Sequence, residues 1–450
     1  MTQTIELPIW LFVLILLFAA VTALSHFLLP SVRWYFRRRL ERAVKKLNER
    51  LERPIEPFKL ARRYDMIQRL SYDPEVTRAI VDYASEHDVP ENVGFQKAQS
   101  YAREIVPSFS AFAYFGFGIR VARWLANALY TVRTGPENDA RLADLPKDAT
   151  VIFIMNHRSN MDYLLVTYLA ARASALSYAV GEWARVWPLS KLIKSLGAYF
   201  IRRKSRGALY RKVLARYVQM ARDGGVTQAV FPEGGLSLNG KLMPPKMGLL
   251  SYILEEYDPE AREVIFVPVA INYDRVLEDR VLIAADQRGD RRFGGKVSVV
   301  FKFIARKIWL RLRGKFLRFG TAAVVFGEPV SLRTYAEPPS AQELAQDLMA
   351  RIQDVMPVLF VPLLSRAVLQ AEAALDDAAL ARAVNKQIAA CQGELPLTAP
   401  EDFAATVRLA REHMEQRKLI TQTDGGWEKT PDQIPVLQYY SNSIAHFFAQ

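Results

Sequence analysis

The chain has 450 residues, of which 50% are hydrophobic, 24% charged and 11% aromatic, so it is too apolar for a disordered protein and long enough for two or three folded parts. A single cysteine excludes a disulfide framework and a multi-thiolate metal site, and five scattered histidines show no ligand spacing. We therefore expect no metal. The net charge of +13 predicts an anionic partner: a phosphate, an acidic carrier protein, nucleic acid or a membrane surface.

The first predicted element is a membrane anchor. Residues 9–29 contain no charged side chain, and a helix of this length, at about 1.5 Å per residue, matches the core of a bilayer. A strongly basic segment follows Pro30, which indicates a single pass in the cytoplasmic membrane with the bulk of the chain facing the cytoplasm. A cleaved signal peptide is the alternative, but its basic residues would precede the apolar run.

A helical connecting subdomain is expected next, over residues 37–135, after the anchor and basic segment of residues 1–36. Its helices are amphipathic and are interrupted by prolines. Residues 108–130 are apolar but contain Arg120 and Arg123, so a second span is disfavoured. Two alternatives stay open for this segment: a helix lying on the membrane, or an ordinary buried helix.

Short β-branched runs alternate with helical stretches from about residue 149, which predicts an α/β domain with a mixed, largely parallel sheet flanked by helices over residues 136–336. The active site should lie where loops leave the carboxyl ends of the strands. An Ala-rich helical domain is expected over residues 337–450. The expected strands cover 150–155, 175–180, 198–203, 227–232, 264–271, 296–303 and 322–327.

The loop after the first of these strands reads NHRSNMD and holds a candidate general-base pair, His157 and Asp162. On a regular helix these residues would lie about 140° apart around the axis, so they can meet only in a turn. A carboxylate on one ring nitrogen fixes the imidazole and leaves the other nitrogen to accept a proton from a hydroxyl. A helix cap beside a solvated histidine would give the same spacing.

Three later loops add candidate binding residues. Arg202 and Arg203 end a strand, where adjacent guanidinium groups suit phosphate binding or form solvated surface. A Gly/Pro-rich loop follows FPEGG, and a simple turn is its alternative interpretation. Pro268 interrupts the strand 264–271 and suggests an edge strand or a bend beside the cleft. The loop supplies Glu233, Gly234, Gly235, Ser237, Lys241 and Lys246.

These blocks together resemble the glycerolipid acyltransferases, and most closely the bacterial and mitochondrial glycerol-3-phosphate 1-O-acyltransferases. Four motifs match in order, NHRSNMD, GAYFIRR, FPEGG with PPKMG, and FVPVAINYDRV, and LQYYSNSIAHFF near the C-terminus resembles the tail of the glycerol-3-phosphate enzymes. One departure stands out: Leu236 occupies the position of an arginine in the family's third block.

The resemblance implies a role for each block. His157 would be the general base and Asp162 would orient it. Binding of the phosphorylated acceptor would fall on Arg202, Arg203, Glu233 and Gly234, and Pro268 would lie on the acyl-donor side. The other expected substrate-binding residues are Arg158, Gly235, Ser237, Lys241 and Lys246.

The implied activity is transfer of a fatty acyl group from acyl-CoA or acyl carrier protein, as co-substrate and without another cofactor, to the sn-1 hydroxyl of glycerol 3-phosphate in phospholipid biosynthesis. Because Cys391 lies far from the α/β domain, direct transfer is expected instead of a thiol-bound intermediate. The alternatives are a lysophosphatidate or other lysophospholipid acyltransferase and a non-catalytic membrane-bound lipid-binding protein. A lipid hydrolase lacks a recognisable nucleophile, and nucleic acid is not an expected partner.

Overall fold

The computed structural model describes residues 8–11, 13–17, 38–39, 41–135, 137–171, 174–181, 189–202, 207–289, 318–335, 337–390 and 402–448. They divide into two compact units, Met1–Pro54 and Ile55–Gln450. Among these residues no helix is both long and apolar enough to cross a bilayer, and residues 18–37, which include most of the expected anchor, lie outside them. The single-pass anchor therefore stays a prediction.

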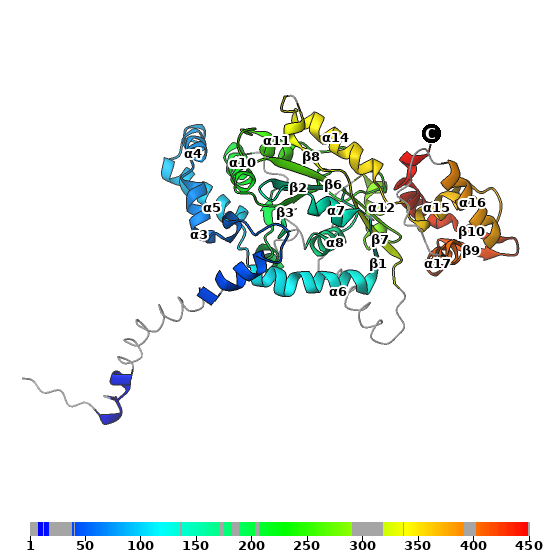
Figure 1. The fold of residues 1–450 in the computed structure, drawn as a ribbon, viewed down its shortest axis with the longest axis horizontal. Helices are drawn as coiled ribbons and strands as arrows, with labels where there is room; N and C mark the ends of the chain where they lie inside the picture. The colour runs from blue at the N-terminus through cyan, green and yellow to red at the C-terminus, as the bar shows by residue number, and fades with distance from the viewer. Residues whose placement is uncertain are drawn as a thin grey trace, which may run out of the picture. The chain divides into compact units, whose positions relative to one another are not determined.

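The second unit is built around a mixed sheet with the strand order β1-β7-β6-β2-β5-β3-β4, and β8 adds a further pairing to β6 (Figure 1). Strands β6, β2, β5, β3 and β4 are mutually parallel, whereas β7 and β8 run antiparallel to β6 and β1 runs parallel to β7. This confirms the predicted α/β class. The strands are β1 Thr131–Thr134, β2 Thr150–Met155, β3 Ser177–Gly181, β4 Tyr199–Ile201, β5 Gln228–Val230, β6 Val264–Tyr273, β7 Thr321–Phe326 and β8 Val330–Ser331.

The central strands β2 and β6 are buried along their whole length, which explains why they appear in the sequence as continuous apolar runs. The prediction that Pro268 marks an edge strand is wrong, since β6 lies between β2 and β7. Pro268 is tolerated because β7 ends opposite Val269 and β8 begins opposite Phe266. The Pro268 carbonyl accepts from Gly327 N at 2.8 Å, so the missing N–H falls in the gap between these two strands.

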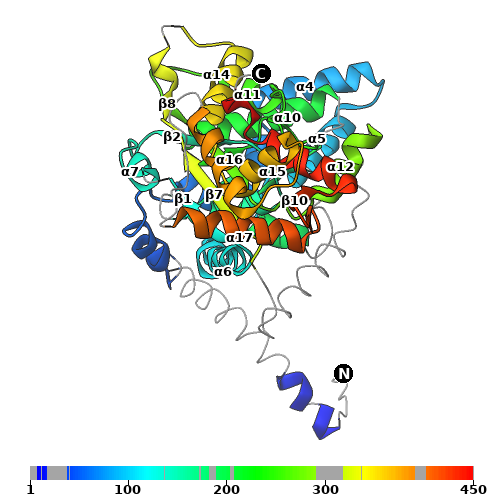
Figure 2. The ribbon, with the colours of Figure 1, turned by 90° about the vertical axis from the view of Figure 1, so that its right-hand side faces the viewer.

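Helices cover both faces of the sheet. Figures 1 and 2 show α10, α11 and α14 on one side and α6 and α8 on the other. The segment 108–130 becomes a π-helix, Phe112–Gly118, that continues into α6 and packs through α6 against α8. The helices of this part are α2 Pro57–Leu60, α3 Arg63–Ser71, α4 Pro74–Glu86, α5 Glu91–Ile105, α6 Ile119–Leu129, α7 Asn138–Ala143, α8 Met161–Leu169, α9 Leu189–Ser195, α10 Ala208–Asp223, α11 Gly248–Leu254 and α12 Asp279–Arg288.

The C-terminal region is helical with one hairpin. Its central helix, α15, contacts α16, α17 and α18. The hairpin strands β9 and β10, which the sequence does not predict, pair in antiparallel fashion. The elements are α14 Ala341–Asp354, α15 Phe360–Gln370, α16 Asp377–Ala390, α17 Phe403–Gln416, β9 Ile420–Thr423, β10 Gly426–Lys429 and α18 Ile434–Asn442.

Six of the seven expected strands are present, each within two residues of its predicted ends; β3, β4 and β5 are shorter than expected and β6 is longer. The expected strand 296–303 lies outside the described residues. Strand β1 precedes residue 136 yet pairs with β7, so the sheet begins within the stretch expected to be helical. A four-residue strand is too short to show an apolar period of its own.

Candidate active site

The loop between β2 and α8 brings His157 and Asp162 together. His157 Nδ1 lies 2.9 Å from Asp162 Oδ2, and both side chains are buried. Asp162 Oδ2 also accepts from the backbone N–H groups of Arg158 at 2.7 Å and Ser159 at 3.0 Å. These bonds draw the loop into a tight turn over the first turn of α8, which explains how residues five apart in the sequence meet.

The other carboxylate oxygen of Asp162 has a partner that the sequence interpretation missed. The Tyr273 hydroxyl, at the end of β6, donates to Asp162 Oδ1 at 2.5 Å. Burial raises the pKa of Tyr273 well above its ordinary value, so this hydroxyl keeps its proton and acts as a donor. Asp162 thus receives hydrogen bonds on both oxygens, which fixes the carboxylate that orients His157.

Aromatic rings hold the imidazole. The His157 ring stacks on Phe231 with centroids 4.0 Å apart, and Tyr163 approaches it edge-on at 5.5 Å. The described residues give His157 Nε2 no hydrogen-bond partner, whereas Nδ1 faces Asp162. This arrangement leaves one ring nitrogen to accept a proton, as a general base requires.

Glu233 joins two loops at this site. Its Oε1 accepts from His157 N at 2.8 Å and its Oε2 accepts from Met243 N at 3.0 Å. Burial raises the pKa of Glu233 to about 7. Ser237 N donates to His157 O at 2.9 Å, so the FPEGG loop is hydrogen-bonded to residues 156–162, the candidate catalytic loop. In this structure Glu233 acts on the backbone that positions the imidazole.

Arg158 points into the protein. It donates to the Gly240 carbonyl and, at 3.1 Å, to Asn272 Oδ1. Asn272 Nδ2 in turn donates to Pro357 O at 2.9 Å and Ser443 Oγ at 3.2 Å, which lie in the C-terminal region. Arg158 therefore links the candidate catalytic loop, through Asn272, to the C-terminal region, while its expected contact with substrate stays a prediction.

The other candidate binding residues belong to the same loop as Glu233. Gly234 has a φ of +65°, which favours glycine, and a side chain there would meet Lys246. Gly235 lies half-buried in the same turn. Ser237 is buried and donates to Lys241 O at 2.6 Å, whereas the Lys241 and Lys246 side chains are exposed. Their contacts with an acceptor stay predictions.

Arg202 lies at the end of β4 in a different setting. It makes a two-pronged contact with Glu104, at 2.9 and 2.6 Å, between the rings of Tyr101 and Tyr210. Arg203 lies outside the described residues. The structure therefore does not bring Arg202 to the dyad, and any phosphate would have to share this guanidinium with Glu104.

Glu278 is a second group that the sequence interpretation missed. It accepts from Ser159 Oγ at 2.7 Å and from Asn160 Nδ2 at 3.0 Å, and burial raises its pKa. Tyr273 belongs to the motif FVPVAINYDRV, so its place after a predicted strand was a usable signal, whereas nothing local marks Glu278. Within the described residues, no cluster of three or more His, Cys, Asp or Glu is arranged to hold a metal ion.

Replacing Tyr273 by phenylalanine tests the hydrogen bond to Asp162. Without this donor the Asp162 carboxylate loses one of the bonds that fix it and the imidazole is held less firmly, so kcat should fall about fivefold, in line with the loss of one hydrogen bond. Tyr130→Phe is the matched control, since Tyr130 packs on Tyr273 but donates to Arg275 O. An unchanged kcat in folded Tyr273→Phe would contradict this role.

Two family models match the chain along its length. Residues 138–272 match the acyltransferase model, and residues 309–450 match the model of the glycerol-3-phosphate acyltransferase C-terminal region. The first match contains the His157–Asp162 pair and most of the sheet, and the second contains Pro357 and Ser443, which Asn272 contacts. The resemblance to glycerolipid acyltransferases is thereby confirmed.

Individual relatives agree with these matches. A glycerol-3-phosphate acyltransferase of Pseudomonas paraeruginosa is 27% identical over 87% of this chain and 49% of its own length. One of Haemophilus influenzae is 30% identical over 62% of this chain and 33% of its own length. The chain thus spans about half the length, or less, of these relatives. A crystal structure of a 1-acyl-sn-glycerophosphate acyltransferase from Thermotoga maritima covers 61% of this chain and 92% of its own, at 19% identity and a TM-score of 0.33.

Proposed function

We propose that this chain is an O-acyltransferase that moves a fatty acyl group from a thioester, acyl-CoA or acyl carrier protein, to the sn-1 hydroxyl of glycerol 3-phosphate. The observation that carries the proposal is the buried His157–Asp162 pair at the carboxyl end of β2. This pair lies within the segment that matches the acyltransferase model. The place is also where an α/β sheet usually binds its substrates.

The geometry supports direct transfer. His157 Nε2 accepts the proton of the acceptor hydroxyl as its oxygen attacks the thioester carbonyl. Collapse of the tetrahedral intermediate breaks the carbon–sulfur bond, and the departing thiolate takes the proton back from the imidazolium. Asp162 stays ionised and holds the ring through Nδ1. The products are an acyl ester and a free thiol, with no covalent enzyme intermediate.

Two observations bear on the identity of the acceptor. Relatives named glycerol-3-phosphate acyltransferase support glycerol 3-phosphate, while Leu236 in place of the family's arginine favours a lysophosphatidate. We expect kcat/KM for glycerol 3-phosphate to exceed that for lysophosphatidate, and Leu236→Arg to leave it equal or higher. Rates with both acceptors, measured on the full chain, test this. Acylation of lysophosphatidate alone would decide for the alternative.

An exposed apolar face supports membrane association. Phe112, Phe117 and Trp124 on the π-helix and α6 are 77%, 55% and 52% exposed, while Ala122, Ala126 and Leu129 are buried. Arg120 and Arg123 lie on the same helix and, with Trp124, line a surface hollow. Because an apolar face bordered by arginines suits anionic lipid, we propose that this face lies on the membrane, where the acylated product would partition.

Replacing Phe112, Phe117 and Trp124 together by serine should weaken binding to vesicles of anionic lipid by at least about tenfold, since three large apolar side chains would no longer enter the interface. Sedimentation with vesicles measures this best in a chain lacking residues 1–30, which keeps the compact unit of residues 55–450. The control replaces exposed apolar residues elsewhere, Tyr64, Val81 and Val281, by serine. Equal loss in both triple variants would contradict a specific membrane face.

A further inference from the structure

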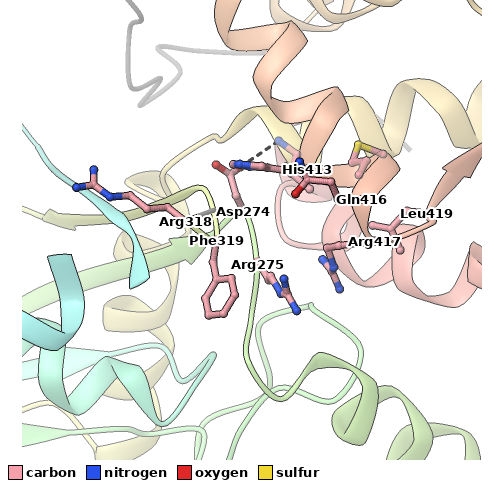
Figure 3. A pocket seen from close by; sticks show the side chains of 10 residues that line it. Asp274, Arg275, Arg318, Phe319, His413, Gln416, Arg417 and Leu419 are labelled. Atoms are coloured by element: carbon pink, nitrogen blue, oxygen red, sulfur yellow. Dashed lines mark hydrogen bonds between the residues drawn. The ribbon is translucent and has the colours of Figure 1, made fainter. Parts of the chain in front are cut away.

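A second candidate site lies away from the His157–Asp162 pair, in a pocket between the α/β sheet and the C-terminal helices (Figure 3). Asp274 and Arg275 line it from the end of β6, Arg318 and Phe319 from the start of β7, and residues 413–419 from α17 and the turn that follows. Three arginines therefore line this pocket. The proposed acyl transfer gives none of them a role.

Arg275 contacts an aromatic ring in this pocket. Its guanidinium lies 4.3 Å from the centre of the Phe319 ring and donates no hydrogen bond to a described residue, since Tyr130 contacts only its backbone carbonyl. Burial and the nearby Arg417 guanidinium lower the pKa of Arg275, so the folded chain holds this cation at an energetic cost. Phe319 offers this cation a ring face and Asp279 lies near enough to favour its charge, but no described residue accepts a hydrogen bond from its guanidinium, so its N–H groups can still bind an anion.

Arg417 provides the second positive charge. Asp279 and, at 3.1 Å, the Tyr440 hydroxyl hold it in place. Figure 3 shows the guanidinium groups of Arg275 and Arg417 directed to the same side of the pocket, with Arg318 pointing away from both. Arg417 lies close enough to lower the pKa of Arg275, and two neighbouring guanidinium groups can share the oxygens of one phosphate.

Asp274 is the acidic group in the pocket, but its oxygens already have partners. Oδ1 accepts from Val361 N at 3.1 Å and Oδ2 accepts from Thr321 N at 2.7 Å. Burial also raises the pKa of Asp274, which favours the neutral, protonated form of this carboxyl group. Asp274 therefore serves the backbone of β7 and α15 and leaves Arg275 to bind an anion, which would share Arg417 with Asp279.

We propose that this pocket binds a phosphate group between Arg275 and Arg417. The group could be part of a phosphate-bearing acyl donor or a free phosphate compound, and both present the same oxygens. The acyl donor is a geometrically suitable source. The Tyr273 hydroxyl contacts Asp162, and Asp274 and Arg275 follow Tyr273 in the chain. The pocket and the His157–Asp162 pair therefore lie at the same edge of the sheet. Only this choice of source rests on the proposed function.

Direct binding tests the site itself. Titration of the full chain with pyrophosphate, at constant ionic strength, should give a Kd that Arg275→Gln weakens at least about tenfold, in line with the loss of charge-assisted hydrogen bonds. Arg275→Lys keeps the charge and should lie between the two. Arg318→Gln is the matched control, because Arg318 lines the same pocket but points away, and it should leave the Kd within about twofold. Thermal unfolding of each variant confirms that it is folded.

Kinetics distinguish the two sources. If the phosphate belongs to the donor, Arg275→Gln should raise KM for acyl-CoA several-fold and leave KM for a phosphate-free acyl thioester of pantetheine unchanged. If it is a free phosphate compound, both KM values stay constant while the pyrophosphate Kd still weakens. Equal pyrophosphate affinity in the wild type and in folded Arg275→Gln would overturn the site. Loss of affinity in a chain without transferase activity would keep the site and refute only the proposed function.

Discussion

His157→Ala is expected to lower kcat at least about a hundredfold while the chain stays folded. The substitution removes the only side chain at the carboxyl end of β2 that can accept a proton through a nitrogen, and loss of a general base typically costs two to four orders of magnitude. The imidazole packs on Phe231 and Tyr163, so a small loss of stability accompanies the loss of activity. Acyl transfer and thermal unfolding, measured on the same preparation, separate the two effects.

Two further variants sharpen this test. Asp162→Asn should also cost at least about a hundredfold, because an amide cannot accept the hydrogen bonds of His157 Nδ1, Arg158 N and Ser159 N together. His87→Ala is the control, since His87 lies exposed on α4 and stacks on Tyr83. More than a tenth of the wild-type activity in His157→Ala would contradict a general-base role.

The largest expected effect on stability is at Gly240. This residue has a φ of +85°, and a Cβ atom there would lie 1.9 Å from the Tyr439 carbonyl oxygen of α18. The clash involves backbone that cannot rotate away, so Gly240→Ala must push the loop and α18 apart. Because the Gly240 carbonyl also accepts from Arg158, the displacement would reach the catalytic loop. We expect a loss of at least about 3 kcal/mol in the free energy of unfolding.

Chemical unfolding of Gly240→Ala measures this loss, and activity should fall with it. Gly207→Ala is the matched control: Gly207 is the N-cap of α10, its φ is negative, and no atom of a described residue lies within 4 Å of an added Cβ. Its midpoint of unfolding should stay close to the wild type. A Gly240→Ala variant as stable as Gly207→Ala would show that α18 does not pack against this loop as described.

Much of the fold follows from the sequence because the central strands are buried on both faces. β2 and β6 are unbroken apolar runs, and such runs between helical stretches predict parallel strands directly. β1 and β8 carry little pattern of their own and exist because β7 and β6 supply hydrogen-bonding partners. Pro268 misled the prediction for the same reason: whether a proline fits a strand depends on where the neighbouring strands end.

The candidate site was predictable where its residues are close in sequence. His157 and Asp162 lie in one loop, so turn chemistry was enough to suggest that they meet. Tyr273 and Glu278 reach the same loop from more than a hundred residues away, and only the sheet order brings them there. Arg158 was expected to face a substrate, and its burial against Gly240 and Asn272 depends on a C-terminal region whose position no local pattern encodes.

Acyl transfer to glycerol 3-phosphate is tested by following both products of one reaction. The full chain is incubated with acyl-CoA labelled in the acyl group and with glycerol 3-phosphate, and free thiol and labelled ester are counted together. We expect equal amounts of thiol and 1-acylglycerol 3-phosphate, and neither product above background in His157→Ala. Thiol release with free fatty acid in place of the ester would indicate a hydrolase. Binding of acyl-CoA without either product would indicate a lipid-binding protein and contradict the proposed acyl transfer.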